Sequence, residues 1–399
     1  MSPRRFRRHM PLLVLFSSVL SVPGGLPGSV SAQAPADSTV VLSGGEYVDL
    51  RAGRLRSNGA MVIRGGTIVA IHPPADGWRA PADARVLSLA GHTILPGLID
   101  AHVHLTLAGT PAENAAATLR AGFTTVIDLG SADGAGIRLR DQIAGGQVLG
   151  PAVIAAGSWI GSQGGVCEFG GATVRSAKEA AARAQSDLSQ GADLLKVCVT
   201  GWPAEAVAFP DSVQFKADLL TPVTGAAIAA KRPVYAHAIG RAGALLAAAH
   251  GVRALAHTPI VEAADAHRLR GAGVYLISTL ATLTQRDGAD RVRRSFQSLR
   301  RAGVTIVLGT DAGVLPHGSN ARELVALTEN GLSPLEALRA ATLDAAALLR
   351  STRVGEIAVG RAGDFVVVDG DPLRDVRALE RPVMVLRGGR VVPAATSSP

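Results

Sequence analysis

The chain has 399 residues, 47% of them hydrophobic and 18% charged, and its formal net charge is +8. This composition excludes a disordered protein, and the length suffices for one large barrel-type domain with a smaller unit. The arginines are scattered, so we expect no nucleic-acid partner, and two cysteines are too few for a disulfide scaffold.

Residues 1–32 have the order of a secretory signal peptide. Four arginines (Arg4, Arg5, Arg7 and Arg8) precede an apolar run that ends near Val22, and small residues follow up to Ala32. The run is too short to span a bilayer as a helix. We expect cleavage after Ala32, with Ala34 the second choice and an uncleaved anchor the alternative. Cleavage would remove four arginines and no acids, lower the formal charge from +8 to +4, and leave a periplasmic or secreted protein without membrane contact.

Both ends of the remaining chain predict short antiparallel strands. β-Branched residues are interrupted by Gly, Asn and Pro in five segments, which are 38–50, 59–74, 85–97, 355–372 and 382–394. We expect residues 38–95 and 355–395 to form one small composite β-sandwich domain.

Between these ends, short apolar strands alternate with Ala- and Leu-rich helices. The strand candidates are 98–105, 124–130, 152–157, 194–201, 233–240, 254–259, 274–280 and 305–313. The helix candidates are 112–121, 176–190, 220–231, 241–250, 291–301 and a single long helix within 332–350. This alternation predicts the α/β class and a (β/α)8 TIM-like barrel over residues 96–354.

Polar residues stand at the ends of five of these strands. They are His102 and His104 on the first strand, Lys196 on the fourth, His237 on the fifth, His257 on the sixth and Asp311 on the eighth. In such a barrel the carboxyl ends of the strands face one pocket, and period-2 alternation points both histidines of the first strand the same way. Imidazole nitrogens and carboxylate oxygens are ligands for zinc and other divalent metals, so we expect a metal site.

Lys196 is the unusual member of this set, because an ammonium repels cations and is costly to bury. It would fit if carbon dioxide had added to its amine, since the resulting carbamate is anionic and could bridge two metal ions. The alternative is a salt-bridged lysine beside a single metal.

The motifs PGLIDAHVH, GADLLKV, AHAIG, GTDAG and the run from Pro316 to Thr342 occur in the family order of the amidohydrolase superfamily. The chain resembles its imidazolonepropionase-like and metal-dependent dipeptidase (Xaa-Pro or Xaa-Arg dipeptidase-like) branch over about residues 40–393. The resemblance implies two divalent metal ions, with zinc the favoured metal, bridged by N6-carboxylated Lys196. It places His102, His104 and Asp311 on one ion and His237 and His257 on the other.

The resemblance also implies a reaction, in which a metal-bridging hydroxide attacks an amide and Asp311 passes its proton to the leaving nitrogen. We expect an exported hydrolase of a dipeptide, an N-acyl amino acid or an aryl-acyl amino acid. The alternatives are a cyclic amide or lactone hydrolase, a phosphotriesterase-like hydrolase and a non-catalytic metal-binding barrel. A homo-oligomer is compatible with the family, but no interface is readable.

The chain departs from the family motifs near the predicted pocket. A second histidine is missing in AHAIG, Thr258 follows His257, Ile127 replaces an arginine of the second strand, and Val166 replaces a histidine in GGVCEFGG. These changes bear on the identity of the substrate.

Further residues near the strand ends also carry expectations. His317 follows the eighth strand and is expected either to contact substrate or to order its loop, and Arg241 is a candidate contact for a substrate carboxylate. Asn320 is expected to cap the helix that begins near Glu323. A disulfide between Cys167 and Cys198 is possible, but free thiols are favoured.

Overall fold

The computed structural model describes residues 39–285 and 288–395, so the predicted signal peptide lies outside the described residues. Within these ranges every helix is too short or too polar to cross a membrane.

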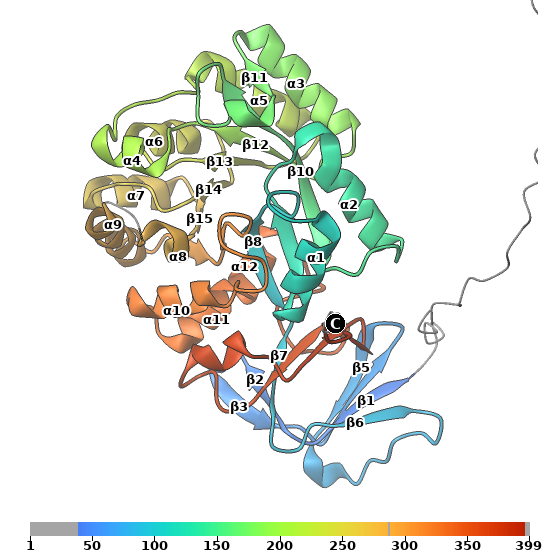
Figure 1. Cartoon of the computed structure of the whole chain (residues 1–399). Coiled ribbons are helices and arrows are strands. Elements are labelled where there is room, and N and C mark those ends of the chain that lie inside the picture. Colours follow the sequence, from blue (N-terminus) through green and yellow to red (C-terminus); the bar gives the residue numbers. More distant parts are fainter. Residues whose placement is uncertain (1–38, 286–287, 396–399) are drawn as a thin grey trace, which may run out of the picture. The chain divides into compact units, whose positions relative to one another are not determined.

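Eight parallel strands form a nearly closed barrel, which confirms the predicted fold (Figure 1). They are β8 (Leu98–Val103), β9 (Phe123–Asp128), β10 (Ala152–Ser162), β12 (Leu194–Cys198), β13 (Val234–His237), β14 (Ala254–Ala256), β15 (Tyr275–Ile277) and β16 (Thr305–Val307). The segment after β16 closes the sheet against β8, because Ala101 N donates to Leu308 O at 2.9 Å and Asp311 N donates to His102 O at 2.8 Å. The two predicted metal-binding segments at 102–104 and 311 are therefore neighbours.

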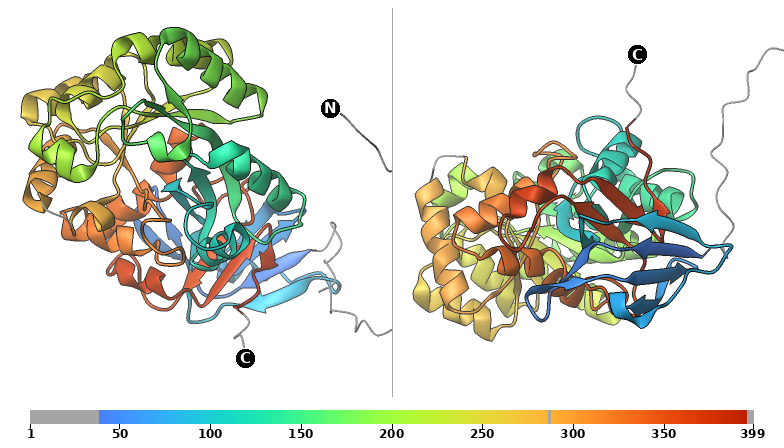
Figure 2. Two further views of the ribbon diagram at one scale, coloured as in Figure 1. Left: turned by 45° about the horizontal axis from the view of Figure 1, so that its top comes forward. Right: turned by 90° about the horizontal axis from the view of Figure 1, so that it is seen from below.

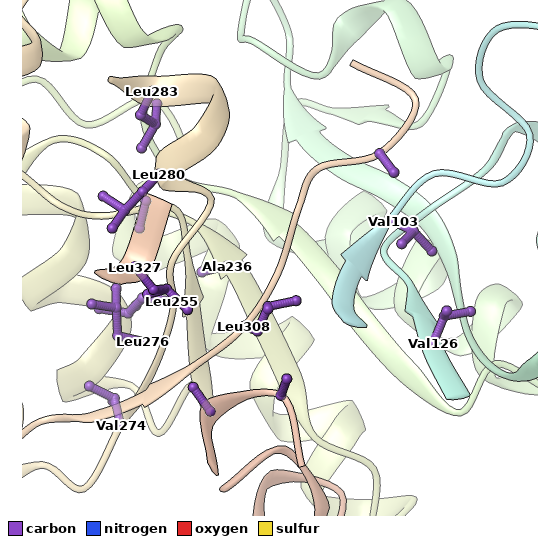
Figure 3. Packing of buried hydrophobic residues seen from close by; sticks show 14 of the residues in the cluster. Val103, Val126, Ala236, Leu255, Val274, Leu276, Leu280, Leu283, Leu308 and Leu327 are labelled. Atoms are coloured by element: carbon purple, nitrogen blue, oxygen red, sulfur yellow. The ribbon is translucent and has the colours of Figure 1, made fainter. Parts of the chain in front are cut away.

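Helices surround the strands, and their apolar side chains pack against the outer face of the barrel. They are α1 (Pro111–Arg120), α2 (Ala135–Ala144), α3 (Ala177–Ser189), α4 (Pro203–Ala208), α5 (Ala217–Ala229), α6 (Arg241–Ala249), α7 (Ala263–Gly271), α8 (Leu280–Leu283), α9 (Ala289–Arg301) and α10 (Arg322–Glu329). Thr110 and Ser176 start α1 and α3, since each side chain accepts a hydrogen bond from the backbone three residues on. Figure 3 shows part of the resulting core, in which Leu255 and Leu276 on the strands pack near Leu280 and Leu327 on the helices.

The single helix predicted within residues 332–350 is wrong, because the chain forms two helices there, α11 (Pro334–Ala340) and α12 (Leu343–Leu348). Thr342 breaks the helix with φ −141° and ψ −90°. The break lets Ala345, Ala346 and Leu348 of α12 join the apolar cluster inside the barrel, where Tyr235 also lies. Burial of these apolar side chains stabilises the broken arrangement over a continuous helix.

The ends of the chain form two further sheets, one from N-terminal strands alone and one from strands of both ends. One has the order β5-β4-β1-β6 and the other the order β19-β18-β17-β7-β2-β3. The strands of these two sheets are β1 (Val40–Ser43), β2 (Glu46–Asp49), β3 (Arg54–Ser57), β4 (Ala60–Arg64), β5 (Thr67–His72), β6 (Arg85–Ser88), β7 (Thr93–Pro96), β17 (Phe365–Val368), β18 (Met384–Arg387) and β19 (Arg390–Val391). The short strand β11 (Thr173–Val174) instead pairs with β10 of the barrel.

The two ends meet where β7 and β17 pair antiparallel, with Ile94 opposite Val367 (Figure 2). Leu42 and Ile63 from the first sheet share a core with Ile94 and Phe365 from the second. Sheets built from both termini were expected, and the exact domain boundaries at 38–95 and 355–395 stay a prediction.

Candidate metal centre

The barrel brings the six predicted side chains to the carboxyl ends of its strands. His102, Lys196 and His237 lie within strands, His104 and His257 directly follow β8 and β14, and Asp311 comes shortly after β16. His102 is 1% exposed and Lys196 is 2% exposed, and the other three histidines are also buried. Buried polar groups of this kind require partners.

Three ligand atoms converge around His102. Its Nε2 lies 3.2 Å from Nε2 of His104, and Oδ1 of Asp311 lies 3.3 Å from both nitrogens. Bonds of about 2.0–2.1 Å at tetrahedral angles, as around zinc, would separate neighbouring ligand atoms by about 3.4 Å. This donor set therefore fits a zinc-sized ion. His102, Asp311 and His257 also offer ligand atoms within 4.8 Å of one another.

His237 and His257 form an adjoining pair, with ring centroids 4.5 Å apart. Nε2 of His237 lies 3.1 Å from the carbonyl oxygen of Gly201, and Nδ1 of His257 lies 3.0 Å from Oγ1 of Thr279. These contacts occupy one nitrogen of each ring and leave Nδ1 of His237 and Nε2 of His257 as the nitrogens available to a cation. Thr279 was not predicted, because only the fold brings it to His257.

Burial and mutual charge set the protonation of the cluster. Burial and the nearby Lys196 lower the pKa of His237 to about 4 and hold that of His102 well below its ordinary value. Burial opposes ionisation of Asp311, yet the surrounding histidines hold its pKa well below the usual range. His102 and His237 thus present neutral imidazoles beside an ionised carboxylate, which is the state that binds a divalent cation.

Lys196 occupies the same buried region. Burial lowers the pKa of its ammonium to about 7, although Asp311 acts in the opposite direction. A substantial fraction of the amine is therefore uncharged at neutral pH, which is the form able to add carbon dioxide.

The backbone is strained at three successive strand ends. His257, Thr279 and Asp311 adopt φ values of 74°, 49° and 58°, in the left-handed region that non-glycine residues rarely occupy. Such residues cost of order 1–3 kcal/mol each and cluster at functional sites. The strained backbone orients two proposed ligands, His257 and Asp311, and also Thr279, the hydrogen-bond partner of His257.

A buried network fixes the position of His102 and Asp311. Asp100 on β8 accepts hydrogen bonds from Oγ1 of Thr310 at 2.7 Å and from Nδ2 of Asn320 at 2.8 Å. The prediction of Asn320 as a helix cap is wrong, because α10 has Ala321 at its N-cap position and Asn320 binds Asp100 instead. The network links β8 to the segment after β16.

Glu323 has a second bracing role that the sequence did not reveal. It lies in the first turn of α10 as expected, but it is fully buried and accepts hydrogen bonds from Ser278 Oγ, Leu280 N and Ala281 N at 2.5–2.8 Å. These contacts hold the chain next to strained Thr279.

His317 and Arg241 both have partners within the chain. Nδ1 of His317 lies 2.9 Å from Oγ1 of Thr118 and its Nε2 lies 3.2 Å from the carbonyl oxygen of His104, which favours the loop-ordering role. The guanidinium of Arg241 pairs with Asp265 at 2.6 Å and with Asp211 at 3.0 Å. These ion pairs account for Arg241 without a substrate carboxylate, whose contact stays a prediction.

Cys167 and Cys198 form a disulfide with a Cα–Cα distance of 6.1 Å, so the expectation of free thiols is wrong. β10 and β12 are paired neighbours, and Cys198 is the last residue of β12, whereas Cys167 lies in the loop that follows β10. The bridge joins the loop after β10 to the strand that carries Lys196.

A cavity of about 1240 Å³ lies at the opposite end of the barrel, lined by the starts of the strands and by residues such as Ile154, Arg253 and Leu348. It does not include any of the six proposed ligands. In (β/α)8 barrels the chemistry is found at the carboxyl ends of the strands, where the histidines lie.

Fold and donor set together define a (β/α)8 barrel protein with a candidate metal site at the carboxyl ends of its strands. The chain belongs to the amidohydrolase family, which matches residues 93–392 and whose members are generally metal-dependent hydrolases acting on carbon–nitrogen bonds. The predicted superfamily and its dipeptidase-like branch are thereby confirmed.

Three relatives illustrate the range of similar proteins. A crystal structure of a Xaa-Pro dipeptidase with bound methionine matches with a TM-score of 0.80 at 28% identity, and the match covers 89% of this chain and 99% of that one. Ochratoxinase from Aspergillus niger is 26% identical over an alignment of 365 residues, and the match covers 75% of this chain and 75% of that one. Adenine deaminase 2 from Rhizobium meliloti (strain 1021) is 31% identical over 377 residues, which span 91% of this chain and 58% of the relative.

Proposed function

We propose that this protein is an exported, binuclear metal-dependent hydrolase that cleaves the amide bond of a dipeptide, an N-acyl amino acid or an aryl-acyl amino acid. The observation that carries the proposal is the convergence of His102, His104 and Asp311 within 3.3 Å, beside His237 and His257. The similarity to a Xaa-Pro dipeptidase supports an amide bond as the target.

The histidines and Lys196 would hold two divalent ions. Addition of carbon dioxide to the uncharged Lys196 amine would form an N–C bond, open one C=O π bond and release one proton to solvent, and the resulting anionic carbamate would be a further donor for these ions. When bound, the ions would lower the pKa of a water molecule toward 7 and polarise the carbonyl of the substrate.

Asp311 would move the proton. Its pKa lies well below the usual range, so the carboxylate is ionised at neutral pH and can accept a proton at Oδ from the attacking water. The protonated carboxyl can then donate that proton to the departing nitrogen, which an amide requires to leave.

Two features support export. Residues 1–32 combine a basic start, an apolar run and small residues, and the Cys167–Cys198 disulfide is of the kind that persists in oxidising compartments.

Metal analysis and a substrate screen test the proposal. We expect about two divalent ions per chain, and turnover of dipeptides or N-acyl amino acids that falls by several powers of ten in Asp311→Asn, because its acid/base group is lost. Asp290→Asn, an exposed carboxylate on α9, is the matched control and should retain full activity.

Metal content of the Asp311→Asn protein is measured alongside, so that loss of an ion is distinguished from loss of proton transfer. Lactones and phosphotriesters in the same screen test the alternative activities. An Asp311→Asn protein as fast as the wild type would refute the assigned role.

A further inference from the structure

We propose that Trp159, Phe169 and Trp202, here called the aromatic strip, bind a planar aromatic group of the substrate. This inference rests on the proposed amide hydrolysis and narrows its substrate class to amides that carry an aromatic ring.

The aromatic strip leads away from a proposed metal ligand. The ring centroid of Trp159 lies 5.5 Å from that of His104, Phe169 follows at 5.1 Å from Trp159, and Trp202 lies 6.1 Å from Phe169 with ring planes inclined by 23°. These separations are those of interacting aromatic pairs. A substrate held at His104 therefore has a line of aromatic rings beside it.

The inner ring is fixed in place. A Cβ atom added to Gly130 would lie 2.6 Å from Nε1 of Trp159, and one added to Gly170 would lie 2.5 Å from its Cε3. The absence of side chains at both glycines lets the backbone approach the indole closely. Trp159 also packs in a cluster with Cys167 and Cys198.

The outer rings come from two loops that are tied together. Phe169 follows Cys167 in the loop after β10, and Trp202 immediately precedes α4. Gln214 connects the loops, because its Oε1 accepts a hydrogen bond from Val166 N at 2.8 Å and its Nε2 donates to Glu205 Oε1 at 3.1 Å. The disulfide anchors the first loop a second time, so the two loops that carry the rings are tied together before any ligand arrives.

The exposure of the strip indicates a ligand. Trp159 is 5% exposed, whereas Phe169 and Trp202 are 57% and 54% exposed. Two large aromatic side chains left open beside a reaction centre can stack with a ring and bury apolar area on both partners. An aliphatic acyl group lacks the flat face that this contact uses.

Equilibrium binding separates this inference from catalysis. The probes are N-(3-phenylpropionyl)glycine and N-acetylglycine, which differ only in the acyl group, and the readout is tryptophan fluorescence of the full chain carrying Asp311→Asn. Trp159 and Trp202 are two of only three tryptophans, so a ring on the strip should change the emission. We expect the phenyl probe to bind at least about tenfold more tightly than the acetyl probe.

Variants assign the effect to the strip. Phe169→Ala and Trp202→Ala should each weaken the phenyl probe about three- to tenfold and leave the acetyl probe unchanged, whereas Trp202→Phe should restore most of the affinity. Both positions are exposed, so these variants should fold. Trp78→Phe, in the loop after β5, is the matched control and should leave both affinities unchanged.

The same substitutions in the active enzyme should lower kcat/KM for the phenyl compound only. Equal affinity for the two probes, or equal loss of both in Trp202→Ala, would overturn the inference. Preferential binding of the phenyl probe without hydrolysis of either compound would uphold the aromatic strip and count against the proposed function.

Discussion

The role of a carboxylate near His102 depends on its position in the barrel and on its partners, and not on its chemical type alone. Asp100 and Asp311 are both carboxylates next to His102, but Asp100 accepts four hydrogen bonds from the chain whereas Oδ1 of Asp311 faces two imidazole nitrogens. The first therefore braces the site, and the second is free to serve as ligand and proton carrier.

Lys196 offers the sharpest test of the bridging role. Lys196→Gln removes the amine that would add carbon dioxide, and we expect metal content to fall from about two ions per chain to one or none, with turnover lost in parallel. Metal analysis of the purified variant checks this. Lys178→Gln, at an exposed position of α3, should keep both ions. Two ions retained in the Lys196 variant would overturn the bridging role, whereas a single ion in both the wild type and the variant would argue for the salt-bridged lysine beside one metal.

The buried histidines predict acid sensitivity of the metal-free protein. The unfolded chain protonates His237 near its ordinary value of 6.5, whereas the folded chain keeps it neutral down to about 4. The unfolded state thus binds more protons between these values, so stability that is full above pH 6.5 is lost as the pH falls toward 4. We expect His237 to contribute a loss of about 2 kcal/mol by pH 5.

Urea unfolding of chelator-treated protein at pH 7.5 and pH 5 measures this loss. His237→Asn cannot titrate in this range and should show a smaller difference between the two conditions. An identical difference in the wild type and the variant would show that the imidazole of His237 is not the group responsible.

At the scale of elements, the loop after β10 is held by covalent chemistry as well as by packing. The Cys167–Cys198 bridge closes a segment with a sequence separation of 31 and lies against Trp159. It restricts the unfolded chain and at the same time ties the loop to β12 near Lys196.

Replacement of both cysteines by serine should lower the free energy of unfolding by about 3–4 kcal/mol on the chain-entropy account. Urea unfolding curves of the double variant and the wild type give this value. A reducing agent should destabilise the wild type by a similar amount and leave the variant unaffected. If the reductant changes both proteins equally, its effect does not come from this bridge.

At the scale of the whole molecule, the fold depends on strands from opposite ends of the chain. β17 supplies Phe365 and Val367 to the core of the two small sheets, and Val366 of the same strand joins the core that extends into the barrel. The alternate residues of one strand thus serve two different cores.

Removal of residues 364–399 should therefore prevent folding of the whole chain, because β7 loses one of its two partner strands and both cores lose buried side chains. Soluble yield and a cooperative thermal transition are the measurements. Removal of residues 396–399 alone, which lie outside the described residues, is the control and should fold. A shortened protein that retains a cooperative transition would show that the barrel does not need the C-terminal strands.

The sequence by itself determined the eight strands, the small β-sheets formed by both ends of the chain and the six polar residues at the strand ends. Each of these depends on short-range patterns, namely apolar runs of strand length, turn residues between them and polar groups at their ends. The family motifs added the expected ligand assignment.

Only the tertiary structure decided the contacts between distant segments. Asn320 binds Asp100 across 220 positions, Glu323 braces the chain beside Thr279, and the helix over 332–350 breaks so that α12 can fill the barrel. Local propensity at these positions favours a cap, a helix start and a continuous helix. Burial and hydrogen bonding to partners far away in the chain outweigh those local preferences, and no local pattern records such partners.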